Sequence, residues 1–295
     1  MDLVEVLKGT NKSIAILGHD TVDCDSAVSI LLLSKLLTHL KVPNRAVILD
    51  KTISELDLEL LKGEGYDLNK YKGSLKKNEA VFLVDHYKTS HSTSVVGCID
   101  HHPTSEKVSY SFYQNKSSAS TSKLIFDLMV KYNYPVTIKE IKLIILSMMV
   151  DTCSLKSTKC PKEHATWVKD TCKKYKIDYN KYYKIGLCLS NLNKPLSIVT
   201  TEGLKKYCYS GINVNSSYIQ VDSDVDVAKY TEHLKTKIKD GLSLWVFLVH
   251  NLESDKTTEY RITKAGIEVI PYNKVTSRGT DVMPVIEKNI KKIVK

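Results

Sequence analysis

The sequence predicts an α/β fold in two parts: a doubly wound, mostly parallel sheet in an N-terminal domain, and a smaller α+β domain after it. Three observations lead to this prediction. The length of 295 residues is enough for two domains. In the first half, short apolar runs rich in β-branched residues alternate with patterns of helical periodicity. After about residue 185 this alternation ends at a polar stretch, 190–197. We therefore expect domains at 1–188 and 197–295.

The elements of the first domain follow from its apolar runs. Residues 13–18 (SIAILG) predict a strand, and residues 26–40 predict a helix because apolar residues recur there at helical spacing and Pro43 follows. The same reasoning predicts strands at 45–50, 80–85 and 94–100 and helices at Ser118–Lys131 and Thr137–Val150. In the stretch SSAST (117–121), backbone N–H groups at a helix start could bind an anion, or the stretch could be an ordinary helix cap.

The second domain is expected to be mixed. The pattern predicts helices at 198–208, 225–239 and 283–294 and strands at 218–221, 244–250 and 258–262.

Charge and composition limit the class of protein. The 43 Lys+Arg against 33 Asp+Glu give a net charge of +10, which favours an anionic partner: nucleic acid, a membrane surface or a phosphate-rich small molecule. The seven scattered cysteines are typical of reduced thiols, and the acidic N-terminus does not resemble a signal peptide, so we expect a cytoplasmic protein. The most apolar stretch, 143–150, is far shorter than the roughly 20 residues that span a bilayer, so no membrane partner is expected.

Acidic and imidazole side chains recur where four apolar segments end. Any one of them could be a helix cap or a solvated loop residue. Together they should meet at one edge of the sheet, where clustered carboxylates repel one another unless a cation is present. The residues are His19, Asp23 and Asp25; Asp85 and His86; Asp100, His101 and His102; and Asp151.

Carboxylate and imidazole ligands without cysteine suit Mn²⁺, Mg²⁺ or Co²⁺. One bridging carboxylate would hold two such ions roughly 3.5–4 Å apart, and a water shared by both would become a hydroxide near neutral pH. A phosphoryl group is the natural substrate of such a centre.

Four motifs in this region resemble those of the DHH phosphoesterase superfamily, and they occur in the family order: G-H-x3-D-x-D-S at 18–26, V-D-H at 84–86, D-H-H at 100–102 and V-D-T at 150–152. The resemblance implies two divalent cations, with Mn²⁺ the expected metal. It assigns His19 and Asp23 to one ion, Asp25, His101 and Asp151 to the other, Asp85 to the bridge, and His102 to substrate contact or acid–base catalysis.

The second domain resembles the DHHA2-type domain shared by family II inorganic pyrophosphatases and exopolyphosphatase or prune-type proteins. The resemblance rests on S-R-G at 277–279 and G-L-K-K-Y at 203–207. It implies that Lys205 and Arg278 bind the substrate phosphates, with the active site in the cleft between the domains. Two positions depart from the family pattern. Gly279 replaces a second basic residue, and Gly203 replaces an acidic one.

These features predict a metal-dependent phosphohydrolase that cleaves inorganic pyrophosphate or short polyphosphate by means of a bridging hydroxide. His19 favours the pyrophosphatase branch, because the exopolyphosphatase and prune branch commonly has Asn there. The alternatives are an exopolyphosphatase or prune-type enzyme, a nucleotide phosphodiesterase of the same superfamily, and a non-catalytic relative that binds phosphate or nucleic acid. A small phosphate-anhydride substrate is the expected partner, nucleic acid is less favoured, and a homodimer stays open.

Overall fold

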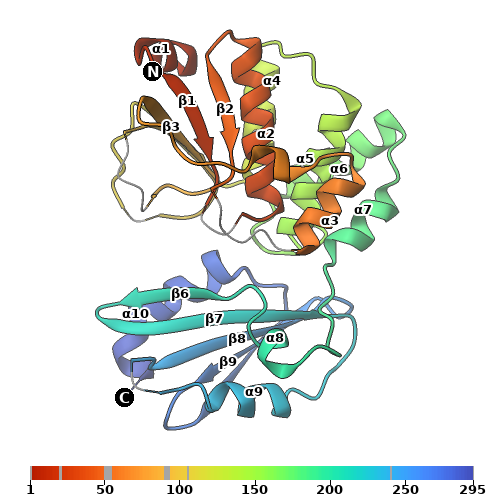
Figure 1. Cartoon of the computed structure of the whole chain (residues 1–295). Helices are drawn as coiled ribbons and strands as arrows, with labels where there is room; N and C mark the ends of the chain where they lie inside the picture. The colour runs from red at the N-terminus through yellow and green to blue at the C-terminus, as the bar shows by residue number, and fades with distance from the viewer. Residues whose placement is uncertain are drawn as a thin grey trace. The chain divides into compact units, whose positions relative to one another are not determined.

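The computed structural model describes residues 2–19, 22–49, 55–89, 94–104, 106–239 and 241–294. The chain divides into two compact units (Figure 1). Unit 1 runs to Leu155 and continues over Cys160–Gly186, whereas unit 2 comprises Lys156–Lys159 and Leu187–Lys295. A four-residue segment between the two stretches of unit 1 thus belongs to the second unit. The predicted boundaries at 1–188 and 197–295 place this segment in the first domain.

Unit 1 is built on the predicted parallel sheet, which the structure confirms. Its strands are β1 (Ser13–Leu17), β2 (Asn44–Val47), β3 (Glu79–Val84), β4 (Val95–Asp100) and β5 (Phe112–Asn115). All pairs are parallel, in the order β2-β1-β3-β4-β5. The order reverses between β1 and β3. In open α/β sheets, ligands bind at the carboxyl ends of the strands beside such a switch point.

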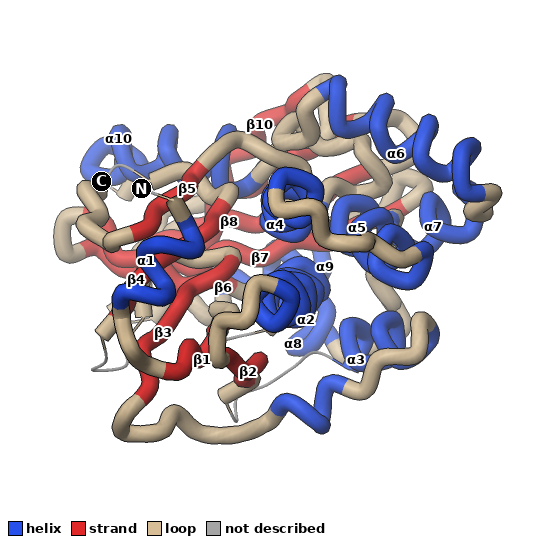
Figure 2. The backbone as a smooth tube through the Cα atoms, turned by 90° about the horizontal axis from the view of Figure 1, so that it is seen from above, coloured by secondary structure: helices blue, strands red, loops and turns tan. Residues whose placement is uncertain are grey.

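The helices of unit 1 include the predicted ones. In the described residues these helices are α1 (Leu3–Gly9), α2 (Cys24–His39), α3 (Glu55–Gly63), a 3₁₀ turn (Leu68–Tyr71), α4 (Thr121–Lys131), α5 (Ile138–Asp151), α6 (Lys162–Tyr175) and α7 (Tyr179–Gly186). Figures 1 and 2 show α2, α4 and α5 side by side, and these helices share one apolar core with the sheet. The opposite face of the sheet packs against loop side chains that include Leu75, Tyr87 and Tyr110.

Unit 2 holds a mixed five-stranded sheet. Its strands are β6 (Lys205–Tyr209), β7 (Ile212–Val221), β8 (Leu244–Asn251), β9 (Lys256–Ile262) and β10 (Ile267–Tyr272), in the order β10-β9-β8-β7-β6. Only β7 and β8 pair in parallel. Helices α8 (Leu196–Val199) and α9 (Ala228–Lys235) cover one face, and α10 (Met283–Ile293) covers the other. The expected α+β domain is therefore confirmed.

The helix predicted over 198–208 is wrong. Helix α8 ends at Val199, and the residues from Lys205 onward form β6, which pairs with β7 as a hairpin. The turn residues Ser210 and Gly211 have positive φ angles of 52° and 79°, as a two-residue hairpin turn requires. The β6 side chains alternate between the two faces of the strand, and Tyr207 and Tyr209 stack on the face that packs against α10.

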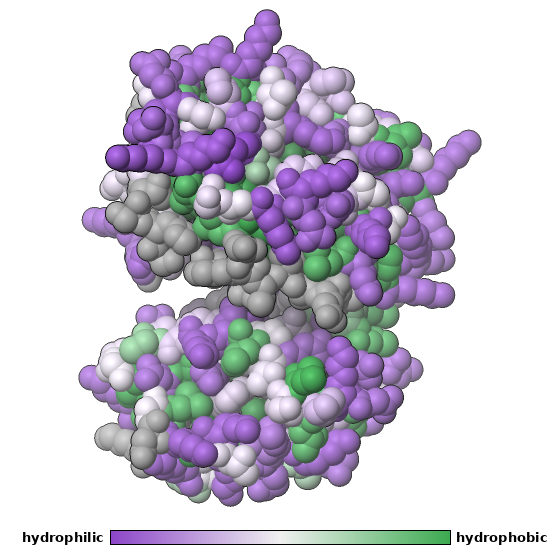
Figure 3. Space-filling model, in the orientation of Figure 1, coloured by the Kyte–Doolittle hydropathy of each residue, from purple (hydrophilic) through white to green (hydrophobic). Residues whose placement is uncertain are grey.

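No helix in the described part of the chain combines the length and the apolar character needed to cross a membrane. The visible face of each unit is mostly hydrophilic, with small scattered apolar areas (Figure 3).

Candidate metal centre

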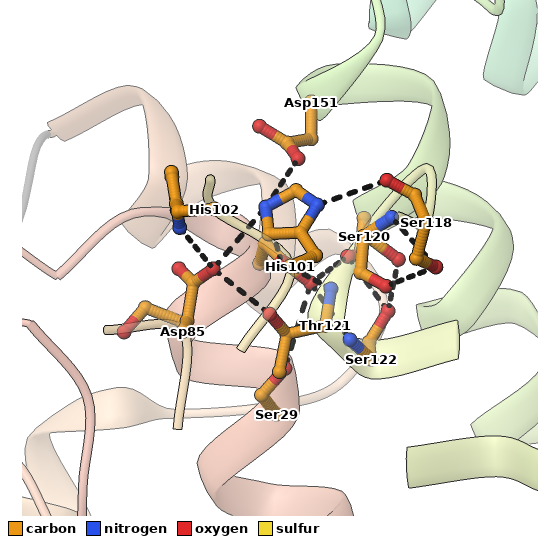
Figure 4. A network of polar contacts seen from close by, with 12 residues as sticks. Ser29, Asp85, His101, His102, Ser118, Ser120, Thr121, Ser122 and Asp151 are labelled. Carbon is orange, nitrogen blue, oxygen red and sulfur yellow. Dashed lines mark hydrogen bonds and ion pairs between the residues drawn. The ribbon is translucent and has the colours of Figure 1, made fainter. Parts of the chain in front are cut away.

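The structure brings together all six predicted metal ligands of unit 1. They come from the ends of β1, β3 and β4, the N-terminus of α2 and the last residue of α5. Together with His102, they offer ligand atoms in three groups, each with its atoms within 4.8 Å of one another. The groups are His19, Asp23 and Asp85; Asp25, His101 and Asp151; and Asp85, His101 and His102. Figure 4 shows Asp85, His102 and Asp151 around the His101 ring.

The loop after β1 places His19 and Asp23 by a close backbone approach. A Cβ at Gly18 would lie 2.0 Å from Ser26 Oγ, so only glycine fits, and this hydroxyl accepts a hydrogen bond from His19 N at 3.1 Å. Asp23 caps α2 by accepting from Ser26 N at 3.0 Å, while its other oxygen lies 3.1 Å from His19 Nε2. The strand end and the helix start therefore hold the two side chains against each other.

Asp25 is anchored by the N-terminus of α4. Its carboxylate accepts hydrogen bonds from Thr121 N at 2.7 Å, Ser122 N at 3.0 Å and Ser147 Oγ at 2.7 Å, and it is only 2% exposed. Ser120 caps the helix through Lys123 N. The segment 117–121 supplies the helix cap, because Ser120 caps α4. The amides of Thr121 and Ser122 beside this cap also bind an anionic group, which is the Asp25 carboxylate.

Asp85 lies between the ligand groups. Its φ of 66° is uncommon for a residue other than glycine, and its N–H donates to Ile99 O at 2.9 Å, which fixes this backbone turn. Its Oδ2 lies 3.3 Å from His19 Nε2, and its Oδ1 lies 3.5 Å from His101 Nε2. Burial, and then the nearby Asp25 carboxylate, raise the pKa of Asp85 well above its usual value.

His101 provides a test of whether a cation fits this site. Its Nδ1 donates to Ser118 O at 3.0 Å, because a carbonyl oxygen can only accept, so the lone pair of the neutral ring lies on Nε2. Nε2 is buried and has no hydrogen-bond partner in the described part of the chain. It lies 3.8, 3.5 and 3.4 Å from oxygens of Asp25, Asp85 and Asp151. A lone pair facing three acidic oxygens suits a bound cation.

Asp100 is a site residue to which sequence reasoning gave no role. Its Oδ1 accepts from His102 N at 3.0 Å and lies 2.9 Å from His102 Nδ1, and the side chain is fully buried. Burial would raise the pKa of Asp100, but the hydrogen bonds from His102 outweigh it and lower that pKa. Asp100 therefore sets the orientation of the His102 ring. Its position directly before the two histidines was the available signal.

His86, expected as a near neighbour of the site, points its Nδ1 at Val84 O, 3.0 Å away. Its ring centroid lies 6.4 Å from that of His19.

Lys205 and Arg278 lie near the same carbonyl in unit 2. Lys205 is opposite Ser216 in the β6–β7 ladder, and Arg278 Nη1 donates to Ser216 O at 3.3 Å. Their predicted contact with substrate phosphates stays a prediction.

Unit 2 also contains a buried histidine that should make its stability depend on pH. Burial, and then the positive charge of Arg278, lower the pKa of His250 from 6.5 to about 4. Above pH 6.5 the ring is neutral in both the folded and unfolded states. As pH falls from 6.5 towards 4, the unfolded state binds the proton first, so stability is lost. The expected loss from His250 is about 2 kcal/mol between pH 7 and pH 5.

Urea unfolding of wild type and His250→Asn at both pH values measures this loss. The asparagine amide can replace Nδ1 in its 2.8 Å hydrogen bond with Thr257 Oγ1 but does not titrate. An equal loss of stability in both proteins would contradict the assignment to His250.

Comparison with known proteins identifies the first domain. Residues 13–151 match the model of the DHH family, N-terminal domain. The solved structure of a protein from Methanococcus jannaschii, named as a family II inorganic pyrophosphatase, is similar at 20% identity and a TM-score of 0.69, covering 93% of this chain and 98% of that one. An exopolyphosphatase-related protein from Bacteroides fragilis is similar at 14% identity and a TM-score of 0.50, covering 99% and 97%. No curated protein matches the sequence.

At these identities the two structures show a shared fold over both units. The family match is more specific, because it runs from the start of β1 to Asp151 and contains every predicted metal ligand. The resemblance found in the four sequence motifs is thereby confirmed, and residues 13–151 form a domain that matches the DHH family, N-terminal domain.

Proposed function

We propose that this protein is a metal-dependent hydrolase that cleaves the phosphoanhydride bonds of inorganic pyrophosphate or short polyphosphate. The observation that supports this most is the position of Asp85, whose two carboxylate oxygens face two different histidines at 3.3 and 3.5 Å. A carboxylate with one oxygen towards each of two ligand groups suits a bridge between two cations. Its uncommon backbone conformation, with a φ of 66°, helps to hold the carboxylate in this position.

His19 and Asp23 would hold one divalent ion, Asp25, His101 and Asp151 would hold the other, and Asp85 would contact both. Mn²⁺ is the metal we expect, and Mg²⁺ and Co²⁺ suit the same ligands. Two such ions, when bound, activate a water as a hydroxide nucleophile and neutralise phosphoryl oxygens. The hydrogen bonds from α4 fix the orientation of the Asp25 carboxylate, and Ser118 O fixes the orientation of the His101 ring.

His102 is placed to contact substrate or transfer a proton. Its Nδ1 lies 2.9 Å from Asp100 Oδ1, which orients the ring, and the side chain is one-third exposed (33%), so a leaving group could reach it. A carboxylate behind a histidine stabilises the imidazolium form, which is the proton donor.

Arg278 and Lys205 would bind the phosphates of the substrate. An arginine can donate two parallel hydrogen bonds to a phosphate, whereas a lysine supplies a mobile charge. Gly279 adds no side chain at the position where the resemblance expects a second basic residue. The DHHA2-type assignment of unit 2, the cleft between the domains, the cytoplasmic location and the homodimer stay predictions.

Replacing Arg278 by alanine should raise KM for pyrophosphate about tenfold and leave kcat nearly unchanged, because a charged hydrogen bond made equally in ground and transition states affects binding alone. Steady-state phosphate release measures both constants. Lys206→Ala is the matched control, since Lys206 is exposed and lies on the other face of β6 from Lys205. An unchanged KM in the Arg278 variant would contradict the role in phosphate binding.

A metal-by-substrate matrix tests the proposed function. Pyrophosphate, tripolyphosphate and a dinucleotide are each incubated with Mn²⁺, Mg²⁺ or Co²⁺, and phosphate or nucleotide release is measured. We expect release from pyrophosphate or tripolyphosphate. Cleavage of the dinucleotide alone would favour the phosphodiesterase alternative. No release from any substrate by metal-loaded protein, with salt-dependent binding to mixed-sequence DNA or RNA, would favour the non-catalytic one.

A further inference from the structure

The turn before β6 packs against the ring of Tyr218. Gly203 has a φ of 58°, and a Cβ at this position would lie 2.1 Å from Tyr218 Cε1 and 2.8 Å from its Cζ. Any residue with a side chain would therefore collide with the ring and be strained in its backbone. Tyr218 N also donates to Glu202 O at 3.1 Å, which ties the same turn to β7. The observed position of the Tyr218 ring therefore requires glycine at residue 203.

The same ring lies beneath the guanidinium group of Arg278. The Arg278 Cζ is 5.5 Å from the centre of the Tyr218 ring, within the range of a cation–π contact. Arg278 Nη1 donates to two backbone oxygens, Gly203 O and Ser216 O. In the described part of the chain, no hydrogen bond is recorded for its Nε or Nη2. The edge of the guanidinium that carries these two nitrogens is the edge that can bind a phosphate with two parallel hydrogen bonds.

The neighbouring ring of His250 adds no charge to this pair at pH 7. The His250 ring lies 5.9 Å from that of Tyr218 and is almost fully buried, and its low pKa keeps it neutral at pH 7. It therefore neither repels the guanidinium nor neutralises it. Arg278 is half-buried and thus partly shielded from water. A cation–π contact is stronger under such conditions than at a fully exposed site.

We propose that Tyr218 is a positioning residue for phosphate binding. Its ring and the carbonyl of Gly203 hold the Arg278 guanidinium so that the Nε and Nη2 edge points to an anionic phosphate group. Gly203 is glycine because the ring fills the space of a side chain. The inference rests on the proposed function for the identity of the anion, which is a phosphate of a pyrophosphate-like substrate. It adds the residue that orients the arginine.

A double-mutant cycle on pyrophosphate binding tests this proposal. The dissociation constant of pyrophosphate is measured by titration calorimetry, with Mn²⁺ present, for wild type, Tyr218→Leu, Arg278→Ala and the double variant. We expect Tyr218→Leu to weaken binding about three- to tenfold in the wild-type background. In the Arg278→Ala background it should have no further effect, because Tyr218 acts through the arginine.

Conservative and steric variants distinguish the effect of the Tyr218 ring on Arg278 from a general effect on packing. Tyr218→Phe keeps the ring and should bind pyrophosphate within about twofold of wild type. Gly203→Ala should weaken binding as Tyr218→Leu does, again only when Arg278 is present, because the new methyl group must displace the ring. Thermal unfolding midpoints show that each variant is folded, and Gly203→Ala tests the proposal if Tyr218→Leu does not fold.

Equal weakening by Tyr218→Leu in both backgrounds would overturn the proposal. Wild-type affinity in Tyr218→Leu would also overturn it, and so would the absence of pyrophosphate binding by the wild type. Binding that follows the expected cycle in a protein that releases no phosphate would support the positioning role and contradict the proposed function. Phosphate release by the wild type, with no coupling between Tyr218 and Arg278 in the cycle, would support the proposed function and contradict the positioning role.

Discussion

Replacing Asp85 by asparagine is expected to reduce phosphate release from pyrophosphate by at least about 100-fold, because one substitution weakens both cation sites at once. The asparagine has the same shape but only one oxygen and no charge. The affinity for Mn²⁺, measured by titration calorimetry, should fall in parallel. The matched control is Asp170→Asn, an exposed residue of α6, which should keep wild-type activity and affinity.

The stability of the metal-free protein distinguishes a lost ligand from a damaged fold. Burial and Asp25 make the charged form of Asp85 unfavourable when no cation is present. An uncharged asparagine removes this cost, so the unfolding midpoint of the metal-free variant should be equal to that of wild type or higher. Wild-type turnover and wild-type Mn²⁺ affinity in the variant would refute the bridging assignment. Lost activity with a much lower midpoint would indicate a folding defect instead.

Mn²⁺ is expected to stabilise unit 1 strongly. A ligand that binds only the folded state contributes about 2.7 kcal/mol per site at a concentration 100 times its Kd. For a unit of this size, such a gain corresponds to a rise in Tm of roughly 5–10 °C per site. Calorimetry with and without Mn²⁺, followed by addition of a chelator, measures the shift and its reversal.

The two units provide an internal reference for this experiment. All the predicted metal ligands lie in unit 1, so a separate transition of unit 2 should not move when Mn²⁺ is added. In Asp85→Asn the shift of unit 1 should be much smaller, and in Asp170→Asn it should equal that of wild type. An equal shift in Asp85→Asn would show that the metal binds elsewhere in the protein.

The strands and helices around the candidate metal centre were predictable because buried elements require apolar residues, and these form recognisable patterns in the sequence. Strand β3 is buried along its whole length, and α2 is buried over most of its turns, so both appear as continuous or helically spaced apolar residues. The start of α5 was also predictable, since the predicted helix begins at Thr137, which forms a capping box with Glu140.

Half-buried elements were harder to predict. The edge strand β5 (FYQN) is intermediate in burial at all four residues, so it contains no continuous apolar run. The lysines and tyrosines of β6 (KKYCY) are also compatible with a helix. The hairpin turn at Ser210 and Gly211 is the feature that favours a strand. Strand β10 was missed because Glu268 and Pro271 interrupt its apolar residues.

The sequence by itself determined the parallel sheet of unit 1 and the identity of its candidate ligands, because a ligand at the end of a buried strand is marked by the strand that precedes it. Only the tertiary structure decided how these ligands are held. The hydrogen bonds from α4 to Asp25 join residues 96 and 97 positions apart. The fit of Gly203 under Tyr218 and the inclusion of Lys156–Lys159 in unit 2 are likewise contacts between distant segments. Local periodicity records which residues are buried, but it does not record which distant group each one meets.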